Sequence, residues 1–514
     1  MTTLDRRRFL RGAVATTGGV LVGGSLEALL ASAVSAAPPD RFRVLGPVAD
    51  LRDGIVRLHL PPGFQYRSFH DTDTAPDGIP NDPRPPVFLD DGTRLPGRHD
   101  GMAAFSGPDG NIWLIRNHEL NNPALNQPNP QDAFGPLDQA YDAHGLGGTT
   151  SILVTPFGEV LEAWTSLNGT MMNCAGGGMP WGAWVSCEET VNGPDVGPDF
   201  TGQTNQFLER PHGFIFEVPV GGQSNRVPIM HAGRFPHEAA AYSPVDNALY
   251  LTEDNFAFPS GFYRYLPPND PMVDGHIEDG GTLQMLKVVG VDGAHLEAAQ
   301  TIGATYPVEW VEIPQPFPGP DGLFTPENTP AGFSTPPTND QALTFVGTQG
   351  RAQGAAGFSR LEGAKFTRHE VYFTSTQGGG AAETGPELIA GYGNGTGQVW
   401  SYHPGTQTLT CRFQAPSGAV LDFPDNITAK SDRGTIILCE DGAAPNFIRG
   451  LTRDGELFDI ALNQLRRNSD GAPRFGEEFA GATFGPGTDT LYVNIQASAA
   501  ITFAIWGPWG RLGV

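Results

Sequence analysis

The chain has 514 residues, a length that allows one large domain or several small ones. Glycine (68) and proline (46) are abundant, which is typical of turn-rich β structure. The formal net charge of −25 argues against nucleic acid or an anionic membrane surface as a partner, because both would repel an acidic protein.

The first 36 residues are predicted to be a twin-arginine export signal. Residues 5–11 read DRRRFLR, and an apolar run rich in alanine and glycine continues to about Leu30, before the small residues 31–36. This order is typical of a signal that is cleaved after Ala36. An uncleaved membrane anchor is the alternative, although the run is only weakly hydrophobic.

We therefore expect the twin-arginine translocase as a partner during export, and a periplasmic or extracellular location. Removal of the signal takes away four arginines and two acidic residues, so the net charge would change from −25 to −27. No other segment of the sequence is long and apolar enough to span a bilayer, so no stable membrane insertion is expected.

Six short apolar runs are predicted to be β-strands, because β-branched and aromatic residues dominate them and glycine, proline or aspartate flanks them. Most neighbouring runs are about 55 to 70 residues apart, a period typical of propeller blades. We predict an all-β fold, a six-bladed β-propeller with long loop insertions, formed by residues 37–514 as one domain. A two-sheet sandwich is the alternative. The runs are Ile112–Glu119, Ala183–Glu189, Leu249–Asn255, Val371–Gln377, Ile436–Gly442 and Leu491–Gln496.

Most of these runs stop at acidic or amide residues. Four residues on from Trp113, Trp184, Leu249 and Ile436 stand Asn117, Glu188, Glu253 and Glu440, and the same count from Val371 gives Ser375. In a propeller, equivalent strand ends converge near the central channel. We therefore expect these side chains, which are distant in sequence, to be neighbours in space.

The first run ends in Asn117-His118-Glu119. On a strand, Asn117 and Glu119 share one face, and His118 lies on the other. His118 is therefore interpreted as a packing residue rather than as a metal ligand.

The stretch 173–189 reads NCAGGGMPWGAWVSCEE and combines Cys174 in a glycine-rich loop with Glu188 and Glu189. A soft sulfur ligand and hard oxygen ligands together indicate a mixed metal site. The alternative is a buried strand with a solvated acidic end. The segment from about 267 to 341 is rich in proline, glycine and aspartate and is a candidate cap outside the blades.

Arg360 and Glu362 lie two residues apart, so in an extended chain both side chains face the same way. An arginine beside a metal-binding acid could hold a substrate oxyanion while the acid holds the cation, and a surface ion pair is the alternative. Further oxygens come from Asp425-Asn426, Glu440-Asp441 and Glu477-Glu478.

The four cysteines, Cys174, Cys187, Cys411 and Cys439, could form two disulfides in an oxidising compartment. Cys187 and Cys439 occupy matching places in their strands, and the pairing stays open. The sequence has no Gly-x-Ser-x-Gly elbow, no His-Glu-x-x-His motif and no P-loop.

Over most of its mature length the chain resembles the PhoX-type alkaline phosphatases, a family of secreted bacterial enzymes. Several motifs together carry the resemblance. They are the twin-arginine leader, Asn117-His118-Glu119, the stretch 173–189, Gly233-Arg234 with His237-Glu238, Arg360-x-Glu362, and Gly481-Ala482-Thr483-Phe484 with Leu491-Tyr492-Val493-Asn494.

The resemblance implies a six-bladed propeller with an oxo-bridged cluster of iron (Fe³⁺) and calcium (Ca²⁺) in its channel. It implies that Asn117 and Arg360 contact phosphate. The residues expected to hold iron are Cys174, Glu253 and Glu362, and those expected to hold calcium are Glu119, Glu188, Glu189, Glu440 and Asp441.

The predicted function is that of a metal-dependent phosphatase that hydrolyses phosphate monoesters. The bridging oxygen or a metal-bound hydroxide would attack phosphorus, which suits the lack of a serine nucleophile. The partner is a small phosphate ester, and a monomer is expected. One alternative is a calcium-dependent propeller hydrolase of lactones or phosphotriesters, and another is a non-catalytic exported calcium-binding propeller.

Overall fold

The computed structural model describes residues 43–74, 85–123, 130–430, 434–443 and 445–514. The predicted export signal, residues 1–36, lies outside the described residues. Within them there is no helix long and apolar enough to cross a membrane.

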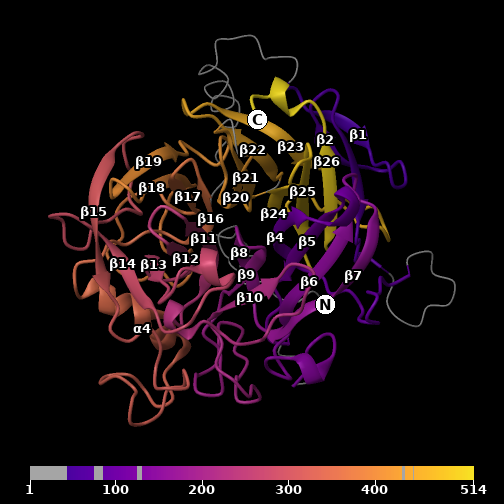
Figure 1. Ribbon diagram of the computed structural model, residues 1–514. Coiled ribbons are helices and arrows are strands. Elements are labelled where there is room, and N and C mark those ends of the chain that lie inside the picture. The colour runs from indigo at the N-terminus through magenta and orange to yellow at the C-terminus, as the bar shows by residue number, and fades with distance from the viewer. Residues whose placement is uncertain (1–42, 75–84, 124–129, 431–433, 444) are drawn as a thin grey trace.

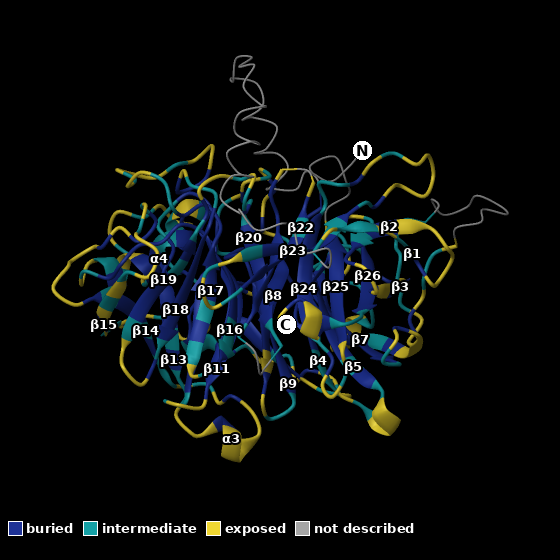
Figure 2. Ribbon diagram, turned by 90° about the horizontal axis from the view of Figure 1, so that it is seen from above, coloured by how far each residue is buried: buried dark blue, intermediate teal, exposed yellow. Residues whose placement is uncertain are grey.

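The fold is all-β, with strands arranged like propeller blades around a central axis (Figure 1). Six strands, here called the ring strands, pack against one another in cyclic order around this axis. They and their neighbours are mostly buried, whereas the outer loops are exposed (Figure 2). The predicted all-β, propeller-like class is therefore confirmed. The ring strands are β4 (His99–Ser106), β8 (Asn173–Met179), β11 (His237–Ser243), β16 (Leu361–Thr367), β20 (Pro424–Ala429) and β24 (Glu478–Phe484).

All six predicted runs are strands, and each pairs antiparallel with the ring strand before it. They are therefore the second strands of their groups, and each one ends where its ring strand begins. These second strands are β5 (Ile112–His118), β9 (Ala183–Glu188), β12 (Ala248–Glu253), β17 (Glu370–Ser375), β21 (Ile436–Glu440) and β25 (Thr490–Gln496).

Further strands extend each group outward. They are β6 (Gly147–Val154), β7 (Val160–Thr170), β10 (Ile215–Pro219), β13 (Phe262–Leu266), β14 (Thr282–Val288), β15 (Thr305–Glu312), β18 (Gln398–His403), β19 (Thr408–Gln414), β22 (Phe447–Leu451), β23 (Leu457–Asn463) and β26 (Ile501–Trp506). The α-helices of the described residues are α3 (Pro271–Asp274) and α4 (Asn339–Arg351).

Hydrogen bonding divides the described strands into five sheets rather than the six expected for six separate blades. The reason is β15, whose first residues pair with β19 and so join two groups into one nine-stranded sheet, β11 to β15 with β19 to β16. The predicted cap at about 267–341 is wrong where it includes β14 and β15, because both strands belong to this sheet.

Strands from the N-terminal end complete the last two groups. β3 (Gln65–Phe69) pairs with β26, and β2 (Val56–Leu60) pairs with β23 and with β1 (Gly46–Ala49). The first described strands are thus tied to strands near the other end of the described chain, which fixes β24 beside β4 and closes the ring of strands.

Small residues allow the ring strands to approach closely. A methyl group added to Gly177 would overlap the carbonyl oxygen of Ala240 in the neighbouring ring strand, and one added to Gly363 would lie 2.7 Å from the backbone nitrogen of Ile427. At these positions glycine is required because another backbone occupies the space of a side chain.

We predict that Gly177→Ala destabilises the ring. The added methyl group can be accommodated only by moving backbone, which costs about 1–3 kcal/mol and lowers the midpoint of thermal unfolding. Gly385→Ala is the control, since nothing lies within 4 Å of its added Cβ atom. Equal unfolding midpoints for the two variants would contradict the close packing of β8 and β11.

Candidate metal centre

The ring strands begin with a regular distortion. In β4, β8, β11, β16 and β20 the pairing with the second strand shifts register directly after the first residue. Such a bulge re-aims the side chain that it contains. The second residue of each of these strands, which lies in the bulge, carries a carboxylate or a thiol. These residues are Asp100, Cys174, Glu238, Glu362 and Asp425.

Strained backbone precedes four of these bulges. Arg98, Met172, Arg360 and Phe423, each directly before a ring strand, have φ angles of 50°, 47°, 41° and 52°. Non-glycine residues rarely adopt this left-handed region, and each such residue costs about 1–3 kcal/mol. Strain of this kind is concentrated at functional sites, where the surrounding structure enforces it.

Three buried groups of side chains could each hold a metal ion, with ligand atoms within 4.8 Å of one another. The first group contains Glu119, Cys174 and Glu189. The other two share Asp425: one adds Glu238 and Glu362, and the other adds Asp441 and Glu478. We call these eight residues together the ligand cluster.

The first group surrounds a thiol with carboxylates. The Cys174 thiol is fully buried and donates a hydrogen bond of 2.8 Å to Glu189 Oε2. Burial raises the pKa of Cys174 well above its ordinary value, and the negative charges of Glu189, Glu238 and Glu119 raise it further. Gln496 and Arg98 donate hydrogen bonds to the Glu119 carboxylate. A thiolate among buried carboxylates is unfavourable unless a cation offsets the charge, so the donor set fits a metal ion.

Asn117 lies beside this group, and hydrogen bonds to other protein groups occupy its side-chain amide. Its Nδ2 donates 2.8 Å hydrogen bonds to the carbonyl oxygens of Cys174 and Ala175, and its Oδ1 accepts from Trp184 and Ser186 at 2.9 Å. The amide therefore holds the bulge that aims Cys174. These bonds give Asn117 a positioning role toward Cys174, and its contact with phosphate stays a prediction.

Arg360 lies against the Glu362 side of the ligand cluster. Its guanidinium forms a two-bond fork with Asp254 at 2.7 and 3.0 Å, and it also contacts Glu362 at 3.3 Å and Gln377 at 3.2 Å. The Arg360 side chain is 7% exposed, so the pair with Asp254 is a buried ion pair rather than a surface one. Its contact with phosphate stays a prediction.

Three predicted ligands, Glu188, Glu253 and Glu440, lie outside the ligand cluster because protein donors hold their carboxylates. Glu188 accepts from His212 at 2.6 Å and from the backbone of 171, 213 and 214. Glu253 accepts from Tyr263 and from the backbone of Gly261, both at 2.8 Å. Glu440 accepts from Arg449 at 2.9 Å and from the backbone of 422 and 447.

For two of these three residues, Glu188 and Glu440, the difference from the prediction is one of register. Neighbouring residues on a strand face opposite sides, so if Glu188 and Glu440 point away from the channel, Glu189 and Asp441 point toward it. The carboxylates of Glu188 and Asp142 outweigh burial and raise the pKa of His212 to about 9, so a charged pair anchors the outer side of this strand.

Sequence reasoning placed Glu119, Cys174, Glu189, Glu362 and Asp441 at the site, and each of the five belongs to one of the three groups of the ligand cluster. It did not name Glu238, Asp425 or Glu478 as metal ligands, although Asp425 and Glu478 were noted as further oxygens and Glu238 as part of a motif. A signal for one of them was present, because Cys174, Glu238 and Glu362 each precede a run of glycine and alanine. Such a run marks a ring strand in close contact with its neighbours.

The four cysteines are all buried free thiols, so the open question of their pairing is answered: none forms a disulfide. Cys174 belongs to the ligand cluster, whereas Cys187 and Cys439 lie in apolar core clusters. Burial raises the pKa of these two thiols, which is typical of inert structural cysteines.

The protein is thus an all-β, propeller-like protein with a candidate metal centre, formed by buried carboxylates and one thiol. The sequence profile of the family described as alkaline phosphatase PhoX matches residues 44–157 and 158–499. The chain therefore belongs to the PhoX alkaline phosphatase family and is a phosphatase. A sequence search of curated proteins found no match.

Among solved structures, the chain is similar to Pseudomonas fluorescens PhoX in complex with vanadate, described as a transition state analogue. The TM-score is 0.60 at 17% identity, covering 91% of this chain and 98% of the other. Two gluconolactonases are more distant. XC5397 from Xanthomonas campestris has a TM-score of 0.34 at 12% identity, and the match covers 82% of this chain and 99% of the other. Periplasmic PpgL from Pseudomonas aeruginosa has a TM-score of 0.35 at 8% identity, and the match covers 84% of this chain and 96% of the other.

Neighbouring glutamates give a matched test of which carboxylates bind metal. We expect Glu189→Gln to reduce the metal bound per chain with the fold retained. Glu188→Gln should keep the metal but lower the stability by about 3 kcal/mol, because it breaks the buried pair with His212. Elemental analysis and thermal unfolding measure the two effects. Metal loss in Glu188→Gln with full metal content in Glu189→Gln would reverse the assignment.

Proposed function

We propose that this phosphatase is metal-dependent and hydrolyses phosphate monoesters. The observation that carries the proposal is the Cys174 thiol, buried within 4.8 Å of the Glu119 and Glu189 ligand atoms. A thiol buried among carboxylates is a donor set that fits a bound metal ion. Membership of an alkaline phosphatase family supports the reaction class.

The donor chemistry supports two kinds of ion. Ferric iron accounts for a thiolate among carboxylates better than calcium does, because calcium prefers oxygen donors, so Cys174 would bind iron. The two groups that share Asp425 offer only oxygen atoms and fit calcium. Glu362, expected at iron, lies in one of these oxygen-only groups, and we now assign it to calcium.

The bound ions would neutralise the oxygens of the transferring phosphoryl group and activate the attacking water. The chain itself supplies alignment. Asp254 fixes the plane of the Arg360 guanidinium beside Glu362, so the arginine is pre-oriented to contact the oxygens of a phosphate held at the cluster. Asn117 keeps the Cys174 carbonyl and the bulge in place.

We also propose that the ring strands mark six blades. The cyclic packing of β4, β8, β11, β16, β20 and β24 supports this count, and the β15–β19 pairing would then join the outer edges of two blades. Export by the twin-arginine route to the periplasm or beyond remains part of the proposal and is supported by residues 5–36 of the sequence. A monomeric state remains part of the proposal as well.

The test uses protein purified from a host that loads metals, with a panel of p-nitrophenyl phosphate, a lactone and a phosphotriester. We expect iron and calcium in the protein, monoester turnover, loss of activity on EGTA treatment and recovery with calcium. Cys174→Ser should lose iron and activity together. Arg360→Ala should keep its metals but lose turnover about 100-fold, as expected for removal of a transition-state donor.

Two outcomes would contradict the proposal. Full phosphatase activity and unchanged iron in Cys174→Ser would remove the thiol from the centre. Lactone or phosphotriester turnover with calcium alone, and no hydrolysis of the monoester, would favour the calcium-dependent hydrolase instead.

A further inference from the structure

The channel continues beyond the ligand cluster as two adjoining cavities. A cavity of about 50 Å³ begins directly after the cluster, lined by residues that follow its members on the ring strands, such as Ala175, Ala239 and Gly363. A chamber of about 500 Å³ follows toward the far ends of the ring strands. Lys365, Thr428 and Thr483 line both spaces, so we treat them as one channel chamber.

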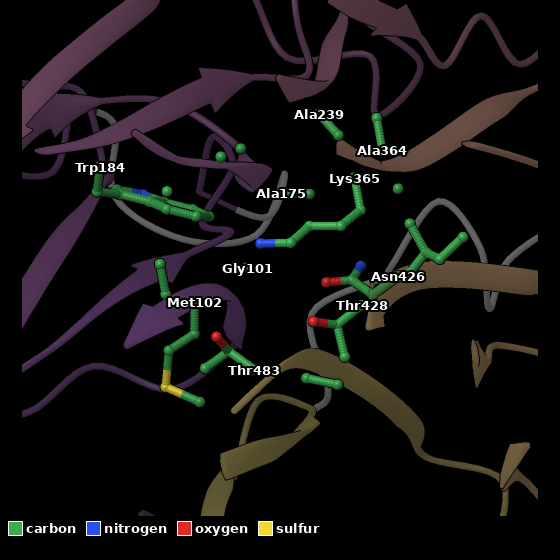
Figure 3. A pocket seen from close by; sticks show the side chains of 17 residues that line it. Gly101, Met102, Ala175, Trp184, Ala239, Ala364, Lys365, Asn426, Thr428 and Thr483 are labelled. Carbon is green, nitrogen blue, oxygen red and sulfur yellow. The ribbon is translucent and has the colours of Figure 1, made fainter. Parts of the chain in front are cut away.

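Lys365 extends into this space from β16. Figure 3 shows its amino group in the middle of the cavity, with the hydroxyl groups of Thr428 and Thr483 on the facing walls. Lys365 and Thr428 each lie three residues along their ring strand from Glu362 and Asp425. At the rise of a β-strand this is about 10 Å, so the group is separate from the ligand cluster.

Lys365 differs from the two other lysines of the chain, Lys287 and Lys430. Lys287 forms an ion pair with Asp292 at 2.9 Å, and Lys430 pairs with Asp489. Among the described residues the Lys365 amino group has no hydrogen bond and no ion pair, and the side-chain hydroxyls of Thr428 and Thr483 have no hydrogen bond either. Burial alone lowers the pKa of Lys365, which records the cost of placing this charge in the channel without a counter-charge.

A bound anion would offset that cost. An ammonium group and two hydroxyl groups on facing walls offer donors to oxygen atoms, and no carboxylate is among the residues that line the chamber. The chamber volume exceeds that of a small oxyanion. We propose that the channel chamber is a second anion site, where Lys365, Thr428 and Thr483 bind a tetrahedral oxyanion such as sulfate or inorganic phosphate.

This inference does not depend on the proposed function, because it concerns binding at residues outside the ligand cluster. The probe is radiolabelled sulfate, measured by equilibrium dialysis against the metal-loaded protein in a chloride buffer of constant ionic strength. We expect wild-type protein to bind one sulfate per chain at the chamber. Lys365→Met should weaken this binding about 10- to 100-fold, as expected for loss of a charge-assisted hydrogen bond.

Lys430→Met is the matched control, since it removes a surface lysine and should leave sulfate binding unchanged. Lys365→Arg should retain sulfate binding because it keeps the positive charge, and Thr428→Val should weaken sulfate binding because it removes a hydroxyl donor. If Lys365→Met fails to fold, Lys365→Arg and Thr428→Val still decide the matter. Sulfate held only by the cations of the ligand cluster would be insensitive to Lys365→Met, and that result, or no sulfate bound at all, would overturn the proposal.

Discussion

Like charges buried at close range are the constraint on which this structure depends. Seven carboxylates and one thiol lie in three groups at one end of the channel, and each group brings its ligand atoms within 4.8 Å of one another. In a buried place such a set is destabilising unless cations bind it. The rest of the fold must therefore hold these groups against their mutual repulsion, or metal ions must do so.

The backbone supplies much of that restraint. Residues with left-handed φ angles lead into four of the six ring strands. Bulges in five of the six direct a carboxylate or a thiol away from the regular alternation of side chains. Glycine and alanine then let adjacent ring strands approach until no side chain fits between them, as at Gly177. The N-terminal strands β2 and β3 tie the last groups to the start of the chain. Strain is thus distributed over a closed ring, which resists the displacement of any one ligand.

The sequence could predict the second strands and the residue types of the site, because β-branched runs that end in acids are a strong local pattern. It could not predict which of two adjacent acids faces the channel. Glu188 and Glu189 are chemically identical, and a single residue of register decides between a pair with His212 and a place beside Cys174. The family resemblance did not resolve this either.

The ring strands themselves were hidden for a different reason. Their small residues, as in the Ala-Gly-Gly-Gly run after Cys174, have low strand propensity and adopt β structure only because tertiary packing requires it. Glu238, which precedes three alanines, therefore carried only a weak local signal. β14 and β15 were obscured by the proline- and glycine-rich turns around them. The hydrogen bonds by which Asn117 holds the Cys174 bulge could not be predicted, because its four partners come from two other strands, β8 and β9.

Anomalous X-ray diffraction from crystals of metal-loaded protein tests the central claim most directly. Data at the iron edge and at long wavelength should place an iron peak within bonding distance of Cys174 Sγ, and calcium peaks among the carboxylates around Asp425. Peaks located instead at Glu188, Glu253 or Glu440, or no peak near Cys174 and Asp425 in active protein, would contradict it.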